Sequence, residues 1–143
     1  MTPVCIILQG IPGSGKSTFA ARLSSRIASA DRYVDYSQPV APQLSKAHAW
    51  CFKDAIAFAM DGRDFVVDNT NLTSIEIAPY HLLARSFHFD VEIRRIHCPP
   101  ETAWGRQTHG VPRQAFDSMV ARFESFEPAP WWAVKNYYRG TGG

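Results

Sequence analysis

The sequence lacks any hydrophobic run long enough to cross a membrane, because no stretch approaches the roughly 18 apolar residues of a spanning helix. The first apolar run, residues 4–8, has no basic region before it and therefore does not resemble a signal peptide. Cysteine is scarce: three thiols show no metal-ligand spacing, and their odd number favours a reducing compartment. We therefore expect a cytoplasmic protein with no membrane partner.

A strong excess of charge is also missing, since 15 basic residues are set against 13 acidic ones, for a net charge of +2. A nucleic-acid partner would therefore have to be bound through a local patch, because the whole molecule has no strong basic field. At 143 residues and 45% hydrophobic composition, the chain can bury one core and is too short for two ordinary domains. We expect one domain over residues 1–143, with an aromatic tail, residues 127–143, packed on it.

Glycine is concentrated in one segment, GIPGSGKST, which fits the phosphate-binding loop (P-loop, or Walker A) pattern G-x-x-x-x-G-K-[ST]. The segment follows an apolar run that is typical of a buried strand and precedes a predicted helix over residues 17–24. Glycines allow the backbone N–H groups to turn inward around phosphate oxygens, while Lys16 reaches the β and γ phosphates and Ser17 binds Mg²⁺. The motif predicts that ATP is bound by Gly10, Ile11, Pro12, Gly13, Ser14, Gly15, Lys16, Ser17 and Thr18.

Strand and helix patterns alternate along the rest of the chain, which is typical of a parallel sheet with helices on both faces. Strands are predicted at residues 4–8, 26–30, 64–68 and 89–98. Helices are predicted at residues 17–24, 44–60, 73–87 and 101–107, and from residue 112 onward. The fold class is therefore α/β, a small P-loop NTPase fold of about four strands, whose ligands gather at the carboxyl ends of the strands.

Two acidic residues come at predicted strand ends beside the phosphate loop. Asp68 closes the apolar run Phe65-Val66-Val67, a pattern typical of a carboxylate that holds Mg²⁺; the alternative is a plain turn cap. Asp31 ends the second predicted strand and is the candidate general base that would accept a proton from an attacking hydroxyl. A turn-forming role is the alternative for Asp31, and Asp35 ranks second for the role of base.

A short basic segment, WGRQTHGVPR, joins two predicted helices. It carries Arg106, His109 and Arg113, with Gly110 as a pivot. Phosphoryl transfer needs cations around the transferring group, so we interpret the segment as a helical lid, with Arg106 also contacting the nucleotide. A solvated basic loop is the alternative, because arginines are common on protein surfaces.

Aromatic residues raise two further questions. In the tail, aromatic side chains alternate with cations and could stack on unpaired bases, although packing over a sheet edge or a helix is the favoured interpretation; the residues are Trp131, Trp132, Lys135, Tyr137, Tyr138 and Arg139. Trp50 and Trp104 lie in predicted helices among apolar residues, so we expect both to pack in the core.

Four segments, GIPGSGKST, SADRY, VVDNTN and GRQTHGVPRQAFDSMVARFE, resemble in that order the phage-type 5′-hydroxyl polynucleotide kinases and the related kinase-like domain of the NEDD4-binding-protein-2 family. The resemblance covers about residues 4–127. It implies a four-stranded parallel core, ATP with Mg²⁺, and a tunnel for a nucleic-acid end. It also implies that Lys16 and Ser17 bind ATP phosphate and magnesium, that Asp31 is the general base, and that Arg106 lies on the lid.

Three positions depart from that family, all on the acceptor side. Val34 replaces an arginine that contacts acceptor phosphate, a role that nearby Arg32 could take. His109 replaces a lid arginine, and Asn69 stands where the phage enzyme carries its aspartate, so that the carboxylate lies one residue earlier. The substrate-binding residues that we predict are Asp31, Arg32, Asn69, Asn71 and Arg113.

The expected function is an ATP-dependent kinase that phosphorylates a hydroxyl of nucleic acid, first of all the 5′-hydroxyl of a DNA or RNA end. Two alternatives stay open. One is a P-loop kinase acting on a hydroxymethylated DNA base or a small molecule. The other is a nucleotide-binding interaction module with little turnover.

Overall fold

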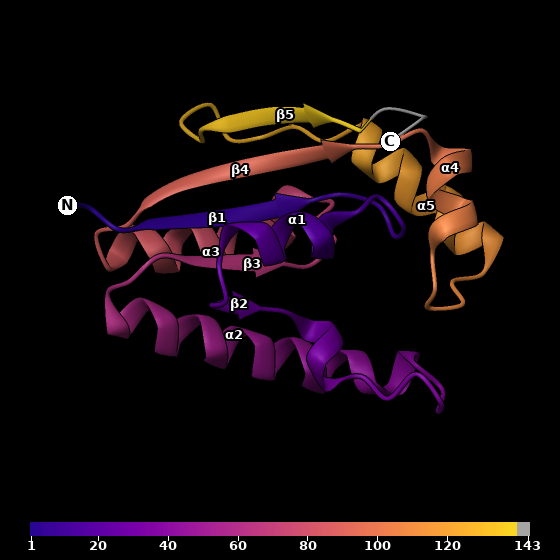
Figure 1. Cartoon of the computed structure of the whole chain (residues 1–143), viewed down its shortest axis with the longest axis horizontal. Coiled ribbons are helices and arrows are strands. Elements are labelled where there is room, and N and C mark those ends of the chain that lie inside the picture. Colours follow the sequence, from indigo (N-terminus) through magenta and orange to yellow (C-terminus); the bar gives the residue numbers. More distant parts are fainter. Residues whose placement is uncertain (140–143) are drawn as a thin grey trace.

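Five parallel strands form one sheet in the computed structural model, which describes residues 1–139 (Figure 1). The strand order is β2-β3-β1-β4-β5, and every neighbouring pair is parallel. The strands are β1 (Val4–Gln9), β2 (Ile27–Ala28), β3 (Phe65–Asp68), β4 (Asp90–His97) and β5 (Val134–Tyr138). β1 therefore lies at the centre, and the carboxyl ends of β3 and β4 flank the start of the phosphate loop.

The α-helices are α1 (Lys16–Leu23), α2 (Leu44–Asp61), α3 (Ser74–Ser86), α4 (Pro100–Arg106) and α5 (Arg113–Glu124). Two 3₁₀ turns, η1 (Ala30–Tyr33) and η2 (Ala41–Gln43), precede α2. Figure 1 shows α4 and α5 beyond the ends toward which β1 and β4 point, so they cover the edge where ligands gather. None of the helices among residues 1–139 is both long and apolar enough to cross a membrane.

Alternating side chains of the inner strands serve the two faces of the sheet, as the two-residue period of a strand requires. Ile7 of β1 and Val67 of β3 belong to the cluster that packs against α2 and α3. Leu8 and Val66 belong to the cluster that contains Ala20 of α1. All of these side chains are buried. The prediction of an α/β fold with helices on both faces of a parallel sheet is confirmed.

The sheet has one more strand than the four predicted. β5 pairs with β4 in parallel and forms an edge that we did not identify as a strand. Within it only Val134 and Tyr137 are half-buried and the other residues are exposed, so its burial does not alternate and its hydrophobic pattern is weak. Before this strand, Trp132 stacks on His81, and within it Tyr137 packs edge-on against Phe19, each with ring centroids 5.2 Å apart. The last residues of the tail, 140–143, lie outside the described residues.

Two further expectations need correction. The second strand covers only Ile27–Ala28, so Asp31 lies in the 3₁₀ turn that follows it and not at a strand end. Trp50 is 42% exposed on α2, so its prediction as a core residue is wrong. Trp104 is half-buried, with its ring centroid 5.2 Å from that of Phe116, as expected of a packed side chain.

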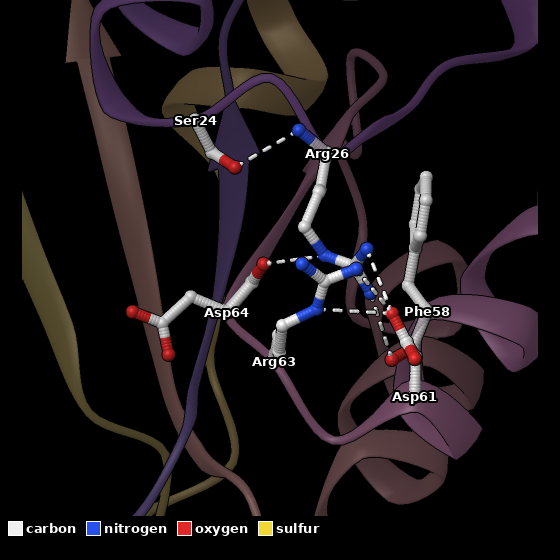
Figure 2. Close-up of polar contacts among 6 residues, drawn as sticks. All are labelled: Ser24, Arg26, Phe58, Asp61, Arg63 and Asp64. Carbon is white, nitrogen blue, oxygen red and sulfur yellow. Dashed lines mark hydrogen bonds and ion pairs between the residues drawn. The ribbon is translucent and has the colours of Figure 1, made fainter.

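A group of charged residues ties the amino ends of the strands together, away from the phosphate loop (Figure 2). Arg26, just before β2, forms a 3.0 Å ion pair with Asp61 at the end of α2. The same guanidinium donates hydrogen bonds to the carbonyl oxygens of Asp64 and Phe58. Asp61 also accepts two hydrogen bonds from Arg63. These contacts hold the end of α2 against the starts of β2 and β3.

A buried polar network lies directly beneath the phosphate loop. The Gln9 amide donates to the Asn71 carbonyl oxygen (2.9 Å), and the Asn71 amide donates to the carbonyl oxygen of Leu8 (2.8 Å). Arg95 donates to the Gln9 side-chain oxygen (2.6 Å) and to the carbonyl oxygen of Phe123 (2.9 Å). Asn71 adopts φ of 48°, a left-handed conformation that asparagine tolerates better than most residues. The network joins the ends of β1, β4 and α5 to the loop after β3.

Helix α4 rests on the phosphate loop at a position where only glycine fits. Gly13 has φ of +82°, and a Cβ added there would lie 2.0 Å from the Ala103 carbonyl oxygen. That distance is far below van der Waals contact, and the neighbouring atom is backbone. The side chain missing at Gly13 therefore allows α4 to close over the loop.

We predict that Gly13→Ala lowers the free energy of unfolding by about 2–5 kcal/mol, because it combines left-handed backbone strain with overpacking against α4. The matched control is Gly110→Ala. Gly110 has φ of +67° and would place its Cβ in open space, so only the strain, about 1–2 kcal/mol, should appear. Urea denaturation of both variants measures the difference, and equal losses would contradict the close contact.

We also predict an acid-dependent contribution from Asp61. Hydrogen bonds and the charge of Arg63, helped by Arg26, lower the pKa of the Asp61 carboxyl. A lowered pKa in the folded state stabilises the protein above the unfolded pKa, about 3.9, and this contribution disappears as pH falls through the folded value. Unfolding measured from pH 7 to pH 2 should show Asp61→Asn less stable than the wild type only at the upper end. A constant difference across the range would disprove the assignment.

Candidate active site

The phosphate loop connects the end of β1 to the start of α1 and leaves almost no room for side chains. Gly15, just before α1, has φ of +94°. A Cβ at Gly15 would lie 3.0 Å from the guanidinium carbon of Arg139, and one at Gly10 would lie 2.7 Å from the Ser14 hydroxyl. The loop therefore presents backbone N–H groups and the positive end of α1 to the space above it, an arrangement suited to an anion.

A pocket of about 490 Å³ opens above this loop and collects residues from distant parts of the chain. Asp31 comes from η1, Arg106 from the end of α4, and His109 from the lid loop. The lining consists of Pro12, Gly13, Gly15, Lys16, Ser17, Thr18, Asp31, Arg106, Gln107, Thr108, His109 and Arg139. The structure thus brings together the predicted phosphate-binding, acid–base and lid residues.

Lys16, which is half-buried, places a cation in the pocket lining. Burial lowers the pKa of its ammonium, while the nearby Asp68 and Asp31 carboxylates raise it. Within residues 1–139, no carboxylate lies at ion-pair distance from Lys16. A partly desolvated charge without a direct partner is unfavourable. The ammonium therefore has the electrostatics of a group whose counter-ion is a bound phosphate.

Ser14 supplies a second sign of a ligand site. Its hydroxyl oxygen is buried and has no hydrogen-bond partner in the part of the chain that the structure describes. Buried polar groups are nearly always paired, so an orphan of this kind calls for an explanation. The glycine-lined cradle, the half-buried ammonium of Lys16 and the orphaned hydroxyl together fit a nucleoside triphosphate.

Ser17 and Asp68 are the two predicted metal ligands. Ser17 lines the pocket, and Asp68 lies at the end of β3, the strand beside the phosphate loop. Burial raises the pKa of Asp68, whereas the nearby Lys16 ammonium and Ser17 hydroxyl lower it. A hydroxyl and a carboxylate near one another are the kind of oxygen donors that Mg²⁺ uses beside nucleotide phosphates, so these residues fit the predicted metal.

Asp31, the candidate base, contacts Tyr36 and the lid residue His109. The Tyr36 hydroxyl donates a 2.5 Å hydrogen bond to one carboxylate oxygen. The other oxygen lies 3.8 Å from Nδ1 of His109. The rings of Tyr36 and His109 stack with centroids 4.1 Å apart. Burial, and then the bond to Asp31, raise the pKa of the Tyr36 phenol, so the phenol keeps its proton as a hydrogen-bond donor.

Arg113 lies outside the pocket. Its guanidinium pairs with Glu101 and Asp117, the latter at 3.1 Å, and lies 4.9 Å from the ring centroid of Trp104. These contacts fasten the start of α5 to α4. The substrate-binding role that we predicted for Arg113 remains a prediction, and the structure adds a role in supporting the lid.

Asn69, Asn71 and Arg32 also lie outside the pocket lining. The Asn69 oxygen accepts a hydrogen bond from the Ala30 amide (2.9 Å), and its amide donates to Cys51 Sγ (3.4 Å). Asn69 therefore braces the turn that carries Asp31. Asn71 is committed to the network beneath the loop, and Arg32 is exposed on η1. Their roles toward a substrate remain predictions.

Three residues of the pocket were not predicted: Gln107, Thr108 and Arg139. Gln107 and Thr108 lie in the lid segment between Arg106 and His109, and this position in the sequence could have predicted them as pocket residues. Arg139 reaches the loop because β5 pairs with β4, and its amide donates to the His97 carbonyl oxygen (2.7 Å). The sequence singled out Arg139 only as a cation of the aromatic tail, and since β5 itself was not identified, nothing in the sequence placed it at the phosphate loop.

Solved structures similar to this chain are P-loop proteins of varied purpose. Kti12 from Chaetomium thermophilum, in complex with ADP-AlF3, is 16% identical, with a TM-score of 0.63 over 96% of this chain and 89% of that chain. A gluconokinase from Sinorhizobium meliloti is 14% identical, with a TM-score of 0.62 over 95% of this chain and 82% of that chain. At these identities the likeness shows the fold alone.

A curated relative gives a closer match in sequence. NEDD4-binding protein 2 from Homo sapiens is 32% identical over 145 aligned positions, which cover 89% of this chain and 8% of the relative. The chain therefore corresponds to a small part of that protein. A family model described as "AAA domain" matches residues 5–126. This chain belongs to that family, and its fold is the α/β fold of P-loop NTPases.

Proposed function

We propose that this protein is an ATP-dependent kinase that transfers the γ-phosphoryl group to a hydroxyl of nucleic acid, in the first place the 5′-hydroxyl of a polynucleotide end. One observation carries the proposal. The Asp31 carboxylate lies in the same pocket as Lys16 and the phosphate loop and already accepts a hydrogen bond from an O–H group, that of Tyr36. A pure nucleotide switch needs no base for an alcohol.

In the proposed reaction the acceptor hydroxyl donates its hydrogen bond to Asp31. As its oxygen bonds to the γ-phosphorus, the bond from phosphorus to the β–γ bridging oxygen breaks, ADP leaves, and the proton passes to Asp31. Lys16 stabilises the charge on the phosphate oxygens, and Arg106 and His109 close over the transferring group. Ser17 and Asp68 would hold Mg²⁺, which supplies further charge neutralisation at the phosphates.

Two lines of support favour nucleic acid as the acceptor. The four motif segments follow the order of the polynucleotide kinase family. NEDD4-binding protein 2, the relative that matches 89% of this chain, is a member of the family that these segments resemble. The fold also includes a gluconokinase, so a small alcohol is the competing acceptor, and the assay below includes one.

We predict that γ-labelled ATP labels one class among 5′-hydroxyl DNA, 5′-hydroxyl RNA and base-modified DNA. Lys16→Ala should lower kcat by about 10²–10³-fold, because the cation at the phosphates is lost. Asp31→Asn should lower kcat by about 10²–10⁴-fold, the usual contribution of a general base, while ATP binding measured by calorimetry is retained. Thin-layer separation of the labelled products measures kcat for both variants.

Asp35→Asn is the matched control, since Asp35 lies four residues from Asp31 and accepts hydrogen bonds from Ser37. Its activity should equal that of the wild type. Labelling of gluconate or another small alcohol, with every oligonucleotide unlabelled, would reject the nucleic-acid acceptor and leave a kinase. ATP binding with no labelled acceptor at all would favour a binding module.

A second prediction concerns the metal. Asp68→Asn should raise the Mg²⁺ concentration needed for half-maximal ATP binding by about 10-fold, the scale of lost support at a metal site. Asp64→Asn, at the opposite end of β3, where the carboxylate accepts from the Val4 amide (2.8 Å), serves as control. Calorimetric ATP titrations at a series of Mg²⁺ concentrations measure the shift, and an unchanged requirement would contradict the role of Asp68.

A further inference from the structure

An aromatic pair lies exposed on the outer side of α2 and η1. The rings of Tyr33 and Trp50 have centroids 6.2 Å apart and an interplanar angle of 30°. Tyr33 is 37% exposed and Trp50 is 42% exposed. The Tyr33 hydroxyl donates a 2.5 Å hydrogen bond to Asp54, which fixes the ring on the helix. Large aromatic surfaces held in place and left open to solvent can stack on planar ligands.

Cations surround this pair. Lys53 places its ammonium 4.3 Å from the Trp50 ring centroid. Arg32 adjoins Tyr33 in η1, and Lys46 lies one helical turn before Trp50. None of these three cations has a carboxylate at ion-pair distance within residues 1–139. Their charge is therefore available to an anionic partner.

Some cations elsewhere on the surface are paired within the protein. Arg63 pairs with Asp61, and Lys135 pairs with Glu92. The one carboxylate bonded at the aromatic pair, that of Asp54, accepts the hydrogen bond from Tyr33. Cations without an ion pair among residues 1–139 thus adjoin open rings on the face made by Arg32, Tyr33, Lys46, Trp50 and Lys53, which we call the α2 face.

The α2 face begins at the candidate base. Arg32 and Tyr33 are the next two residues after Asp31 in the same 3₁₀ turn, and α2 packs directly against that turn. The α2 face therefore adjoins the candidate base along the chain and lies beside the turn that carries it.

We propose that the α2 face binds the acceptor strand as single-stranded nucleic acid, with bases stacking on Trp50 and Tyr33 and phosphates meeting Arg32, Lys46 and Lys53. This inference rests on the proposed function and names the form of its substrate. Aromatic rings interleaved with cations bind single strands with little sequence preference, because every base has a face to stack. A duplex keeps its bases inside the helix and cannot use these rings.

The experiment measures the binding of fluorescent single-stranded octanucleotides by the full chain through anisotropy, with a dinucleotide as competitor. Trp50→Ala should weaken octanucleotide binding by about 10-fold, the scale of one lost stacking contact, and should lower the preference for octanucleotide over dinucleotide. Lys53→Gln should reduce the slope of log affinity against log salt concentration by about 0.7, as expected when one phosphate contact is lost. Lys53→Gln alters only an exposed side chain and tests the proposal even if Trp50→Ala fails to fold.

Trp131→Ala is the matched control, because Trp131 is 77% exposed and lies just before β5, away from η1 and α2. Its octanucleotide affinity should equal that of the wild type. Wild-type affinity in both Trp50→Ala and Lys53→Gln would overturn the proposal, as would equal binding of blunt duplex, or loss of dinucleotide and octanucleotide binding in the same proportion. Strand binding that depends on Trp50, with no labelled end in the kinase assay, would reject the proposed function while the α2 face stands.

Discussion

The half-buried ammonium of Lys16 is the constraint on which the candidate site depends. A cation that has lost part of its hydration gains from a countercharge, and in this structure the nearest carboxylates act on it only through space. The surrounding phosphate loop favours an anion at this position. Its glycines stand where side chains would collide with neighbouring atoms, and the positive end of α1 faces the same space. Helix α4 then covers the loop through the contact between Gly13 and the Ala103 carbonyl.

The position of that loop is secured from below by side chains that have no part in chemistry. Gln9 ends the central strand, pairs in register with Arg95 of β4 and holds the backbone of Asn71. Arg95 extends the connection to the end of α5. The phosphate loop, the segment after β3 and the last helix are thus joined by one hydrogen-bonded network.

The other half of the site depends on the contact between two irregular segments, the 3₁₀ turn η1 and the lid loop. The 3₁₀ turn with Asp31 is braced by Asn69, and the lid loop reaches it through the stacked rings of Tyr36 and His109. The same turn continues into the exposed aromatic pair against α2. Base, lid and the proposed strand-binding face therefore share one structural support, which links acceptor binding to the residue that would remove its proton.

The sequence by itself determined the elements whose signals are local. The spacing of Gly10, Gly15, Lys16 and Ser17 specifies a phosphate loop because few backbone paths can surround a phosphate, and alternating strand and helix patterns specify a parallel sheet. Only the tertiary structure decided what depends on distant pairing. The edge strand β5 forms only by pairing with β4, and that strand carries Arg139 into the pocket. Trp50 faces solvent because the buried stripe of α2 runs along Ala47, Cys51, Ala55 and Ala59. Such outcomes follow from which surfaces meet, a property that no single segment of the chain contains.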